Sequence, residues 1–415
     1  MKIAIMGSGG IGGYFGGCLV RNNDVTFIAR GGHLAAIRKN GLNLSGPRGD
    51  MTIDAAGATD DPREIEPVDL ALFCVKLYET DSAGELIAPL MGKNARVLSC
   101  QNGVDGPERL ARLFGSEWVL GGSAYVSAHI AAPGVTKYIS DMSKIVFGPL
   151  DSRRDPTAES FLAACDGADF VTELSDNMSQ VLWSKMVMLA ANAGVSTMMR
   201  QPVRGVYDNP DARQLAIDAM AEVAAVARAR GVELPDDLIA GLVATSDKFP
   251  PELRASMCHD LLAERRLETD GLSGLIARLG VELDVPVPIN RTIAAALHPL
   301  QGWRYSSLTA RSSRASSPPA QPRKDIPTGQ PSTVAAEMLN WGRPDRPDRH
   351  ISDMVRWRNS SSSAAPAVSF GGRDAALGRQ TTVPGAISAC SRSETSNRNP
   401  AAAAASAGVT WDAHS

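Results

Sequence analysis

The chain has 415 residues, enough for two or three domains, with 44% hydrophobic and 21% charged residues and a formal net charge of −3. This balance is typical of a globular protein and indicates neither a nucleic acid nor a membrane as partner. No apolar run approaches the roughly 20 residues that cross a bilayer. The N-terminus does not resemble a signal peptide, because the chain turns glycine-rich after residue 6.

Cysteine usage indicates a reduced protein in the cytoplasm. None of the six cysteines has CxxC or other paired spacing, and most lie in apolar stretches, as small core residues do. Cys and His residues also lack the spacing of zinc ligands, so we expect no metal. The oligomeric state stays open, a homodimer included.

The order of apolar segments predicts an α/β domain over residues 1–174. Short apolar runs alternate with helical patterns, which is typical of a mostly parallel sheet covered by helices. These runs are residues 2–6, 25–29, 70–75, 95–100 and 119–125.

The pattern is helical from residue 175 to residue 300, so we expect a second, all-helical domain there. Residues 216–230 contain no helix breaker and end at Gly231, a favoured C-cap. Residues 272–279 continue an apolar helical rhythm.

Residues 301–415 have a different composition, rich in Ser, Arg, Pro and Ala, with almost no apolar periodicity. Such a segment buries too little apolar surface to offset its conformational entropy, so we predict a disordered tail. Four of the six tryptophans lie in it at no regular spacing, which is unusual for a linker. Translation in a shifted or read-through frame is one hypothesis, testable by sequencing the locus and its transcript. A natural disordered extension is the alternative.

The most specific local pattern opens the chain. An apolar strand at residues 3–6 leads into a glycine-rich turn, and a helical pattern follows; the turn is Gly7, Ser8, Gly9, Gly10, Ile11 and Gly12. Gly7 permits the tight turn, Gly9 lets the backbone approach a pyrophosphate, and Gly12 lets the helix pack on the strand. The helix N-terminus adds free N–H groups and a positive dipole end. An ordinary glycine-rich turn is the alternative, but the flanking elements favour dinucleotide binding.

The end of the second predicted strand indicates which dinucleotide binds. NAD sites usually carry Asp or Glu there, which accepts from the ribose 2′-OH. This chain has Arg30, followed by two glycines. A guanidinium can bind a 2′-phosphate in a bidentate fork, so NADP(H) is favoured over NAD(H). The alternative is a solvated arginine at a strand end.

Five segments, in this order and spacing, make the chain resemble the ketopantoate reductase (2-dehydropantoate 2-reductase) family over about residues 1–300. They are residues 7–12 with Arg30, Cys-Val-Lys at 74–76, Gln-Asn-Gly at 101–103, Trp-Ser-Lys at 183–185, and Ser256 with Glu-Thr-Asp at 268–270. The resemblance implies a Rossmann domain, which binds NADP, joined to a helical domain like that of 6-phosphogluconate dehydrogenase. Substrate and nicotinamide would meet between the two.

The resemblance also implies roles for individual residues. Lys185 would be the general acid and a substrate ligand, and Ser256 would bind the substrate carboxylate. The implied cofactor contacts are Lys76 near the adenosine phosphates, Asn102 near the nicotinamide ribose, Ala128 through its backbone, and Glu268 on the cofactor or on Lys185.

Chemistry independently supports Lys185 as a proton donor. Delivery of hydride to a ketone carbon leaves charge on the oxygen, which a donor must stabilise and protonate. Lys185 lies in an apolar helical pattern, where desolvation would lower its pKa toward neutrality. The alternative is a lysine that extends from an amphipathic helix into solvent.

The other site residues have structural alternatives on their own. Glu268 could form a surface ion pair with Arg265 or Arg266, and Ser256 could be a helix cap. Lys76 could be a solvated lysine at a strand end, and Asn102 could belong to a turn.

Three positions depart from the family pattern and bear on the substrate. Substrate-binding asparagines of well-known members are replaced by Leu189, Ala193 and Val203. Asn192 is one residue short of the second position and would face about 100° away on a helix. A site built to hold a hydroxyl discriminates through such polar groups, so recognition of pantoate's hydroxyls would be lost. Arg200 or Arg204 could hold a carboxylate instead.

The sequence therefore predicts NADPH-dependent reduction of a small 2-oxo acid, either 2-dehydropantoate to (R)-pantoate in pantothenate biosynthesis or a related ketoacid. A non-enzymatic, redox-sensing protein that binds NADP(H) is the alternative, motivated by the missing asparagines and the tail. The intact Lys185 argues against it. A 3-hydroxy acid or imine substrate is a third reading, disfavoured by the Trp183-x-Lys185 context.

Overall fold

A computed structural model describes residues 1–54, 57–139 and 143–300. The predicted disordered tail and Cys390 lie outside the described residues. No helix among the described residues is both long and apolar enough to cross a membrane.

The first half of the described chain is built on an eight-stranded sheet in the order β12-β11-β8-β7-β6-β1-β2-β5. Its strands are β1 Lys2–Met6, β2 Asp24–Ile28, β5 Gly57–Thr59, β6 Val68–Phe73, β7 Met91–Ser99, β8 Val119–Tyr125, β11 Lys144–Pro149 and β12 Val171–Leu174. All neighbouring strands pair in parallel except β8 and β11. The five strands predicted from the apolar runs all belong to this sheet, and the prediction of a mostly parallel sheet is confirmed.

Side-chain alternation along β1 explains how helices cover both faces of the sheet. Ile3 and Ile5 join one apolar cluster with residues of α1 (Gly10–Leu19) and α5 (Pro156–Ala164). Ala4 and Met6 join another with residues of α3 (Thr80–Ile87) and α4 (Asp105–Phe114). Because successive strand residues point to opposite faces, a continuous apolar run is the pattern of a strand buried on both sides.

A second, four-stranded sheet in the order β4-β3-β10-β9 was not predicted from the sequence. Its strands are β3 Leu42–Ser45, β4 Met51–Ile53, β9 Ala128–Ala132 and β10 Val135–Tyr138. These strands are short, and β9 is largely exposed, so no apolar run marks them. The β9–β10 hairpin packs beside α1, and α2 (Gly31–Asn40) follows β2.

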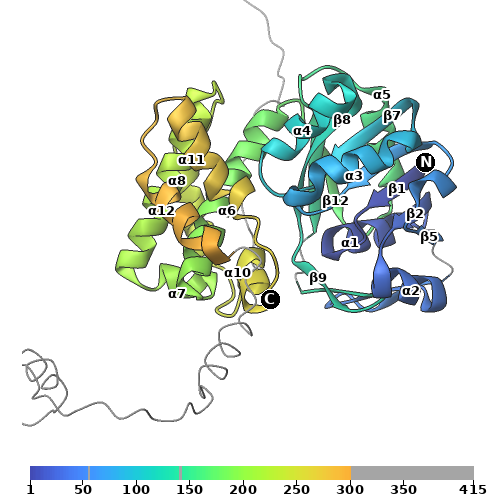
Figure 1. Ribbon diagram of the computed structural model, residues 1–415, viewed down its shortest axis with the longest axis horizontal. Coiled ribbons are helices and arrows are strands. Elements are labelled where there is room, and N and C mark those ends of the chain that lie inside the picture. The colour runs from blue at the N-terminus through green and yellow to red at the C-terminus, as the bar shows by residue number, and fades with distance from the viewer. Residues whose placement is uncertain (55–56, 140–142, 301–415) are drawn as a thin grey trace, which may run out of the picture. The chain divides into compact units, whose positions relative to one another are not determined.

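Helices make up the rest of the described chain (Figure 1). They are α6 Met178–Met199, α7 Val203–Tyr207, α8 Pro210–Ala229, α9 Leu238–Ser246, α10 Ser256–Leu262, α11 Ser273–Glu282 and α12 Pro288–Leu297. The helices predicted at residues 216–230 and 272–279 correspond to α8 and α11, and Gly231 has the positive φ of a C-cap glycine. Most of α6 is buried, because α8, α10 and α12 all pack on it. The prediction of an all-helical second region is confirmed.

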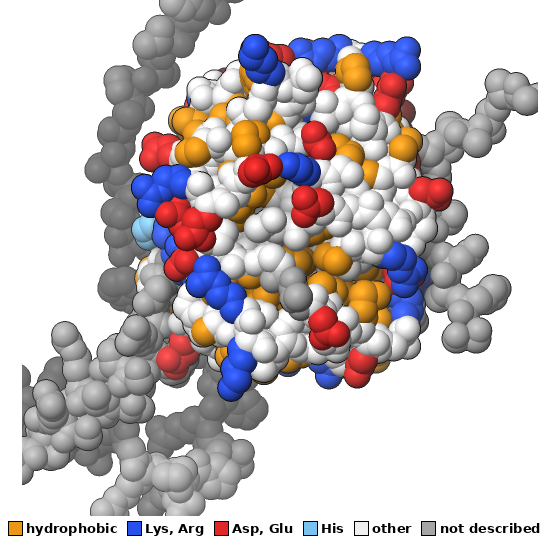
Figure 2. Space-filling view, turned by 90° about the vertical axis from the view of Figure 1, so that its right-hand side faces the viewer, with side chains coloured by type: hydrophobic (Ala, Val, Ile, Leu, Met, Phe, Trp, Pro, Cys, Tyr) orange, Lys and Arg blue, Asp and Glu red, His pale blue; other side chains and the backbone are white. Residues whose placement is uncertain are grey.

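Charged side chains are interspersed on the face of the molecule drawn in Figure 2, where basic and acidic groups alternate among neutral ones. This mixture agrees with the small net charge of −3. The candidate site lies where the ends of the parallel strands meet residues of α6 and α10.

Candidate active site

The turn between β1 and α1 is shaped by close contacts at its glycines. Gly7 has φ +92°, a conformation that favours glycine. A Cβ at Gly10 would lie 2.2 Å from the carbonyl oxygen of Ala128, and one at Gly12 would lie 2.2 Å from that of Gly7. A Cβ at Gly9 would meet nothing within 4 Å. The turn is therefore packed on two sides and open above Gly9.

This cradle fits the pyrophosphate of a dinucleotide. Gly9 is the N-cap of α1, so the first N–H groups of the helix have no partner within the helix and carry the positive end of the helix dipole. Ala128, at the start of β9, touches the turn through its backbone, and its implied contact with the cofactor stays a prediction. Ser8 is buried with its hydroxyl donating to the carbonyl of Ile28 at 3.1 Å, so it shapes the turn.

Arg30 lies where the sequence places it, two residues beyond β2 and directly before α2. Its side chain is 64% exposed, and its Nη2 is 3.5 Å from Oε2 of Glu79. An exposed pair of this kind contributes little stability, so the guanidinium is available to exchange its carboxylate for a phosphate.

The amine of Lys185 is held at the junction of α6 with the sheet. Its Nζ donates to the carbonyl of Ala124 at 2.7 Å and to Oδ1 of Asn102 at 3.3 Å, and it lies 5.1 Å from the centre of the Tyr125 ring. Burial lowers the pKa of Lys185 to about 8, against weaker opposing effects of Cys100 and Glu268. A lysine with this pKa loses and regains a proton readily near neutral pH.

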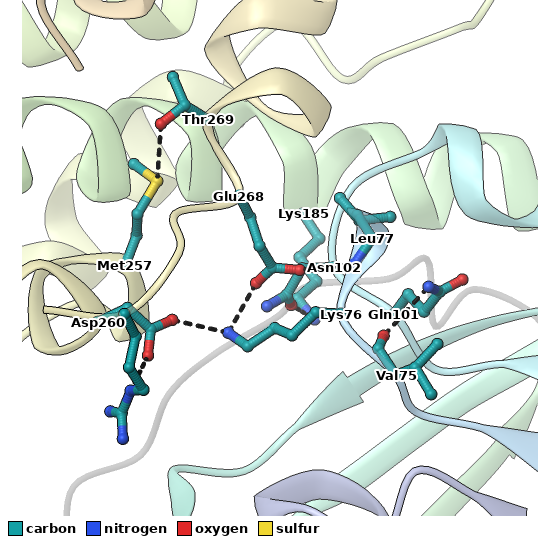
Figure 3. Close-up of polar contacts among 11 residues, drawn as sticks. Val75, Lys76, Leu77, Gln101, Asn102, Lys185, Met257, Asp260, Glu268 and Thr269 are labelled. Atoms are coloured by element: carbon teal, nitrogen blue, oxygen red, sulfur yellow. Dashed lines mark hydrogen bonds and ion pairs between the residues drawn. The ribbon is translucent and has the colours of Figure 1, made fainter. Parts of the chain in front are cut away.

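Lys76 forms the centre of a second polar cluster (Figure 3). Its Nζ is 2.8 Å from Oδ2 of Asp260 and 2.9 Å from Oε2 of Glu268, and both carboxylates are at least nine-tenths buried. The second oxygen of Asp260 accepts from Nε of Arg265 at 2.9 Å, and that of Glu268 accepts from the Leu77 N–H at 3.0 Å. Burial lowers the pKa of Lys76, but the two carboxylates outweigh it and raise the pKa above its usual value.

The charges of this cluster cancel, because two carboxylates face one ammonium and one guanidinium. Lys76 donates two of its three N–H groups to Asp260 and Glu268, so one N–H remains for a ligand. Lys76 can therefore offer a ligand one hydrogen bond, but the cluster around it has no net positive charge. Its implied place near the adenosine phosphates stays a prediction, and this geometry suits a neutral acceptor better.

The remaining residues named from the sequence differ in exposure and in their partners. Ser256 is exposed as the first residue of α10, one turn before Asp260. Ala193 and Val203 are buried, whereas Leu189 is partly exposed one helical turn beyond Lys185. Asn192 accepts from the Tyr207 hydroxyl at 2.6 Å and donates to Ser246 at 3.2 Å, so it belongs to the helical core.

One of the two arginines suggested as carboxylate ligands has other partners for its guanidinium. Arg204 donates to Asp208 at 2.7 Å and to the carbonyl of Asp247 at 2.6 Å. The carbonyl of Arg200, which ends α6 in a left-handed conformation, accepts from Arg254. The sequence analysis missed Asp260, the Ala124 carbonyl and Tyr125. Their contacts are with residues distant in the sequence, so no local pattern identifies them.

Comparison with known proteins identifies the family. Residues 3–152 match the family model described as ketopantoate reductase PanE/ApbA, and residues 177–301 match the model of its C-terminal part. The chain belongs to the ketopantoate reductase family. This confirms the resemblance carried by the five sequence segments.

Individual ketopantoate reductases agree with the assignment. A 2-dehydropantoate 2-reductase of Pyrococcus abyssi is 28% identical over 295 residues, which span 70% of this chain and 94% of the relative. The crystal structure of a PanE/ApbA family ketopantoate reductase from Ralstonia eutropha JMP134 is 34% identical, with a TM-score of 0.67, over 72% of this chain and 98% of that one. A D-mandelate dehydrogenase solved with NADH and anilino(oxo)acetate shares the fold, with a TM-score of 0.67 at 22% identity, over 72% of this chain and 98% of that one.

Membership makes the chain a nicotinamide-dependent oxidoreductase of the ketopantoate reductase type. Its fold, an α/β part with a parallel sheet and a helical C-terminal part, is that of the ketopantoate reductases.

Proposed function

We propose that this protein uses NADPH to reduce a small 2-oxo acid, either 2-dehydropantoate to (R)-pantoate in pantothenate biosynthesis or a related ketoacid. The observation that carries the proposal is the amine of Lys185, half-buried between Asn102 and the Ala124 carbonyl with a pKa of about 8. We place the NADP-binding domain at residues 1–174 and the helical substrate domain at residues 175–300.

Lys185 acts as the proton donor. The charged amine has three N–H groups, of which Ala124 and Asn102 accept two, so the third can donate to the substrate's keto oxygen. When bound, the nicotinamide supplies the hydride. Transfer of the third proton neutralises the charge that develops on the oxygen and completes the alcohol. The neutral amine, with a pKa of about 8, then recovers a proton from solvent near neutral pH.

The cofactor is bound by groups from both parts of the chain. The turn of residues 7–12 holds the pyrophosphate, and Arg30 selects NADPH by binding the 2′-phosphate. Asn102, which accepts from Lys185, offers a polar contact to the nicotinamide ribose. Lys76 is assigned to the adenosine phosphates and Glu268, its partner, to the cofactor or Lys185. The preference for NADPH over NADH rests on the Arg30 guanidinium, because only NADPH carries the 2′-phosphate.

The substrate carboxylate is assigned to Ser256, whose side chain is exposed at the start of α10. One helical turn beyond Lys185, the partly exposed side chain is Leu189, an apolar group. A substrate whose remaining part is apolar fits this surface better than one that carries several hydroxyls. This supports including a related ketoacid alongside 2-dehydropantoate.

The deciding experiment is NADPH oxidation, followed by loss of its near-ultraviolet absorbance, with 2-dehydropantoate and a panel of 2-oxo acids. We expect saturable turnover that Lys185→Ala removes, while binding of NADPH persists. Lys93→Ala is the matched control, because Lys93 is an exposed lysine of β7 near the start of that strand. Tight NADPH binding with no turnover on any 2-oxo acid would contradict the proposal.

A further inference from the structure

A histidine that the proposed mechanism does not use bridges the glycine-rich turn and the neighbouring hairpin. His33 is the third residue of α2 and is partly buried. Its Nε2 lies 2.8 Å from the carbonyl oxygen of Ser8, in the turn. Its Nδ1 accepts from the N–H of Gly134 at 3.0 Å, between β9 and β10.

These two contacts determine the protonation of the ring. The Gly134 N–H can only donate, so Nδ1 must be the unprotonated nitrogen. The Ser8 carbonyl can only accept, so Nε2 must carry the proton and donate it. His33 is therefore neutral in this arrangement. Burial lowers the pKa of His33, which also favours the neutral ring.

The bond to Ser8 orients the peptide that leads into α1. In a planar trans peptide the C=O and the following N–H point in opposite directions. Because His33 holds the Ser8 carbonyl on one side, the Gly9 N–H is directed to the other. Gly9 is the N-cap of α1, so its N–H is among those at the start of the helix that have no partner within the helix.

The hairpin on the other end of the bridge is itself anchored. The carbonyl of Gly134 accepts from the Asn43 N–H at 2.9 Å, and a Cβ at Gly134 would lie 3.0 Å from that of Ala36 in α2. The same hairpin contacts the turn through Ala128, opposite Gly10. His33 thus joins the turn to a support fixed on α2 and β3.

We propose that His33 is a positioning residue for the cofactor, which holds the Ser8–Gly9 peptide with its N–H turned toward the pyrophosphate. The inference rests on the proposed function, in that the turn binds the pyrophosphate of NADPH. His33 does not touch the reacting atoms, and its effect is on nucleotide affinity and not on proton transfer.

Two substitutions separate the two hydrogen bonds. The amide of His33→Gln reaches the position of Nε2 and keeps the bond to Ser8, whereas that of His33→Asn reaches the position of Nδ1 and keeps only the bond to Gly134. In the full-length protein we expect His33→Asn to raise the Kd of both NADPH and NADH by about 3- to 10-fold, as for the loss of one buried hydrogen bond. His33→Gln should bind both nucleotides nearly as well as wild type, and kcat at saturating NADPH should be retained in both variants.

The nucleotide pair distinguishes this role from that of Arg30. Loss of His33 should weaken both nucleotides alike, because both contain the pyrophosphate, whereas Arg30→Ala should weaken NADPH alone. Equal weakening in His33→Gln and His33→Asn, or wild-type Kd values in His33→Asn, would overturn the positioning role and leave the proposed function standing. Failure of the wild type to bind either nucleotide would overturn the proposed function, and this inference with it.

Discussion

Replacing the proposed proton donor with an apolar side chain of similar length should make the protein inactive and more stable. Lys185→Met removes an amine that burial makes costly to charge, while it keeps the volume of the side chain next to Tyr125. We expect the rate of reduction to fall by about 10²- to 10⁴-fold, as for the loss of a general acid. The stability change can be worked out from the pKa.

A pKa of about 8 in the folded protein, against the ordinary 10.5, corresponds to about 3 kcal/mol of unfavourable free energy for the charged amine. This is an upper bound, because the side chain keeps some contact with solvent. The Met variant also leaves the Ala124 carbonyl without its donor, which costs about 1–2 kcal/mol. The expected net gain in unfolding free energy at pH 7 is therefore about 1–2 kcal/mol.

The sign of the pH dependence follows from the same two pKa values. Between about pH 8 and 10.5 the folded wild type binds fewer protons at Lys185 than the unfolded chain does, so its stability rises with pH across that window. Below about pH 8 the amine is charged in both states, so the full unfavourable free energy of charging it in the folded protein is present. The advantage of Lys185→Met should therefore be largest at pH 7 and should shrink toward pH 10.

Urea unfolding of wild type and Lys185→Met at several pH values from 7 to about 10 tests this, because the difference in unfolding free energy is read at each pH. Lys93→Met is the control, since Lys93 is exposed and its replacement should leave no pH-dependent difference. A Lys185→Met variant that is destabilised equally at every pH would refute the claim that the amine is desolvated.

Three further outcomes are expected. With wild-type enzyme, kcat/KM for reduction should decline as the pH rises through about 8, because Lys185 loses its proton; a flat profile to pH 10 would exclude it as the donor. Arg30→Ala should weaken NADPH but not NADH, and Glu79→Gln should strengthen NADPH by freeing Arg30 and removing a charge that repels the phosphate; equal effects on both nucleotides in titrations would contradict this. Gly10→Ala should lose nucleotide affinity and about 1–3 kcal/mol of stability, because its Cβ would overlap the carbonyl of Ala128; a variant with unchanged melting and binding would argue against this packing.

Much of the fold could be predicted from the sequence, because its signals are local. The apolar run of β1, the glycines that follow it and the helical pattern of α1 are consecutive residues. Buried parallel strands also need continuous apolar runs, which stand out from their surroundings. The four-stranded sheet of β3, β4, β9 and β10 was not predicted, because its strands are short and partly exposed and show no continuous apolar run.

The partners of the site residues were decided by the tertiary structure alone. The Lys76–Glu268 pair spans 192 residues of sequence, the contact of Gly134 with His33 spans 101, and that of Lys185 with Ala124 spans 61. The sequence by itself determined the residue types, including a lysine within an apolar helix and an arginine after the second strand. It predicted desolvation of Lys185 but could not decide between a buried amine and one that extends into solvent, and it could not determine that Asp260 and Glu268 would both pair with Lys76. A pKa and a net charge depend on every group that folding brings near, and that proximity exists only in the folded chain.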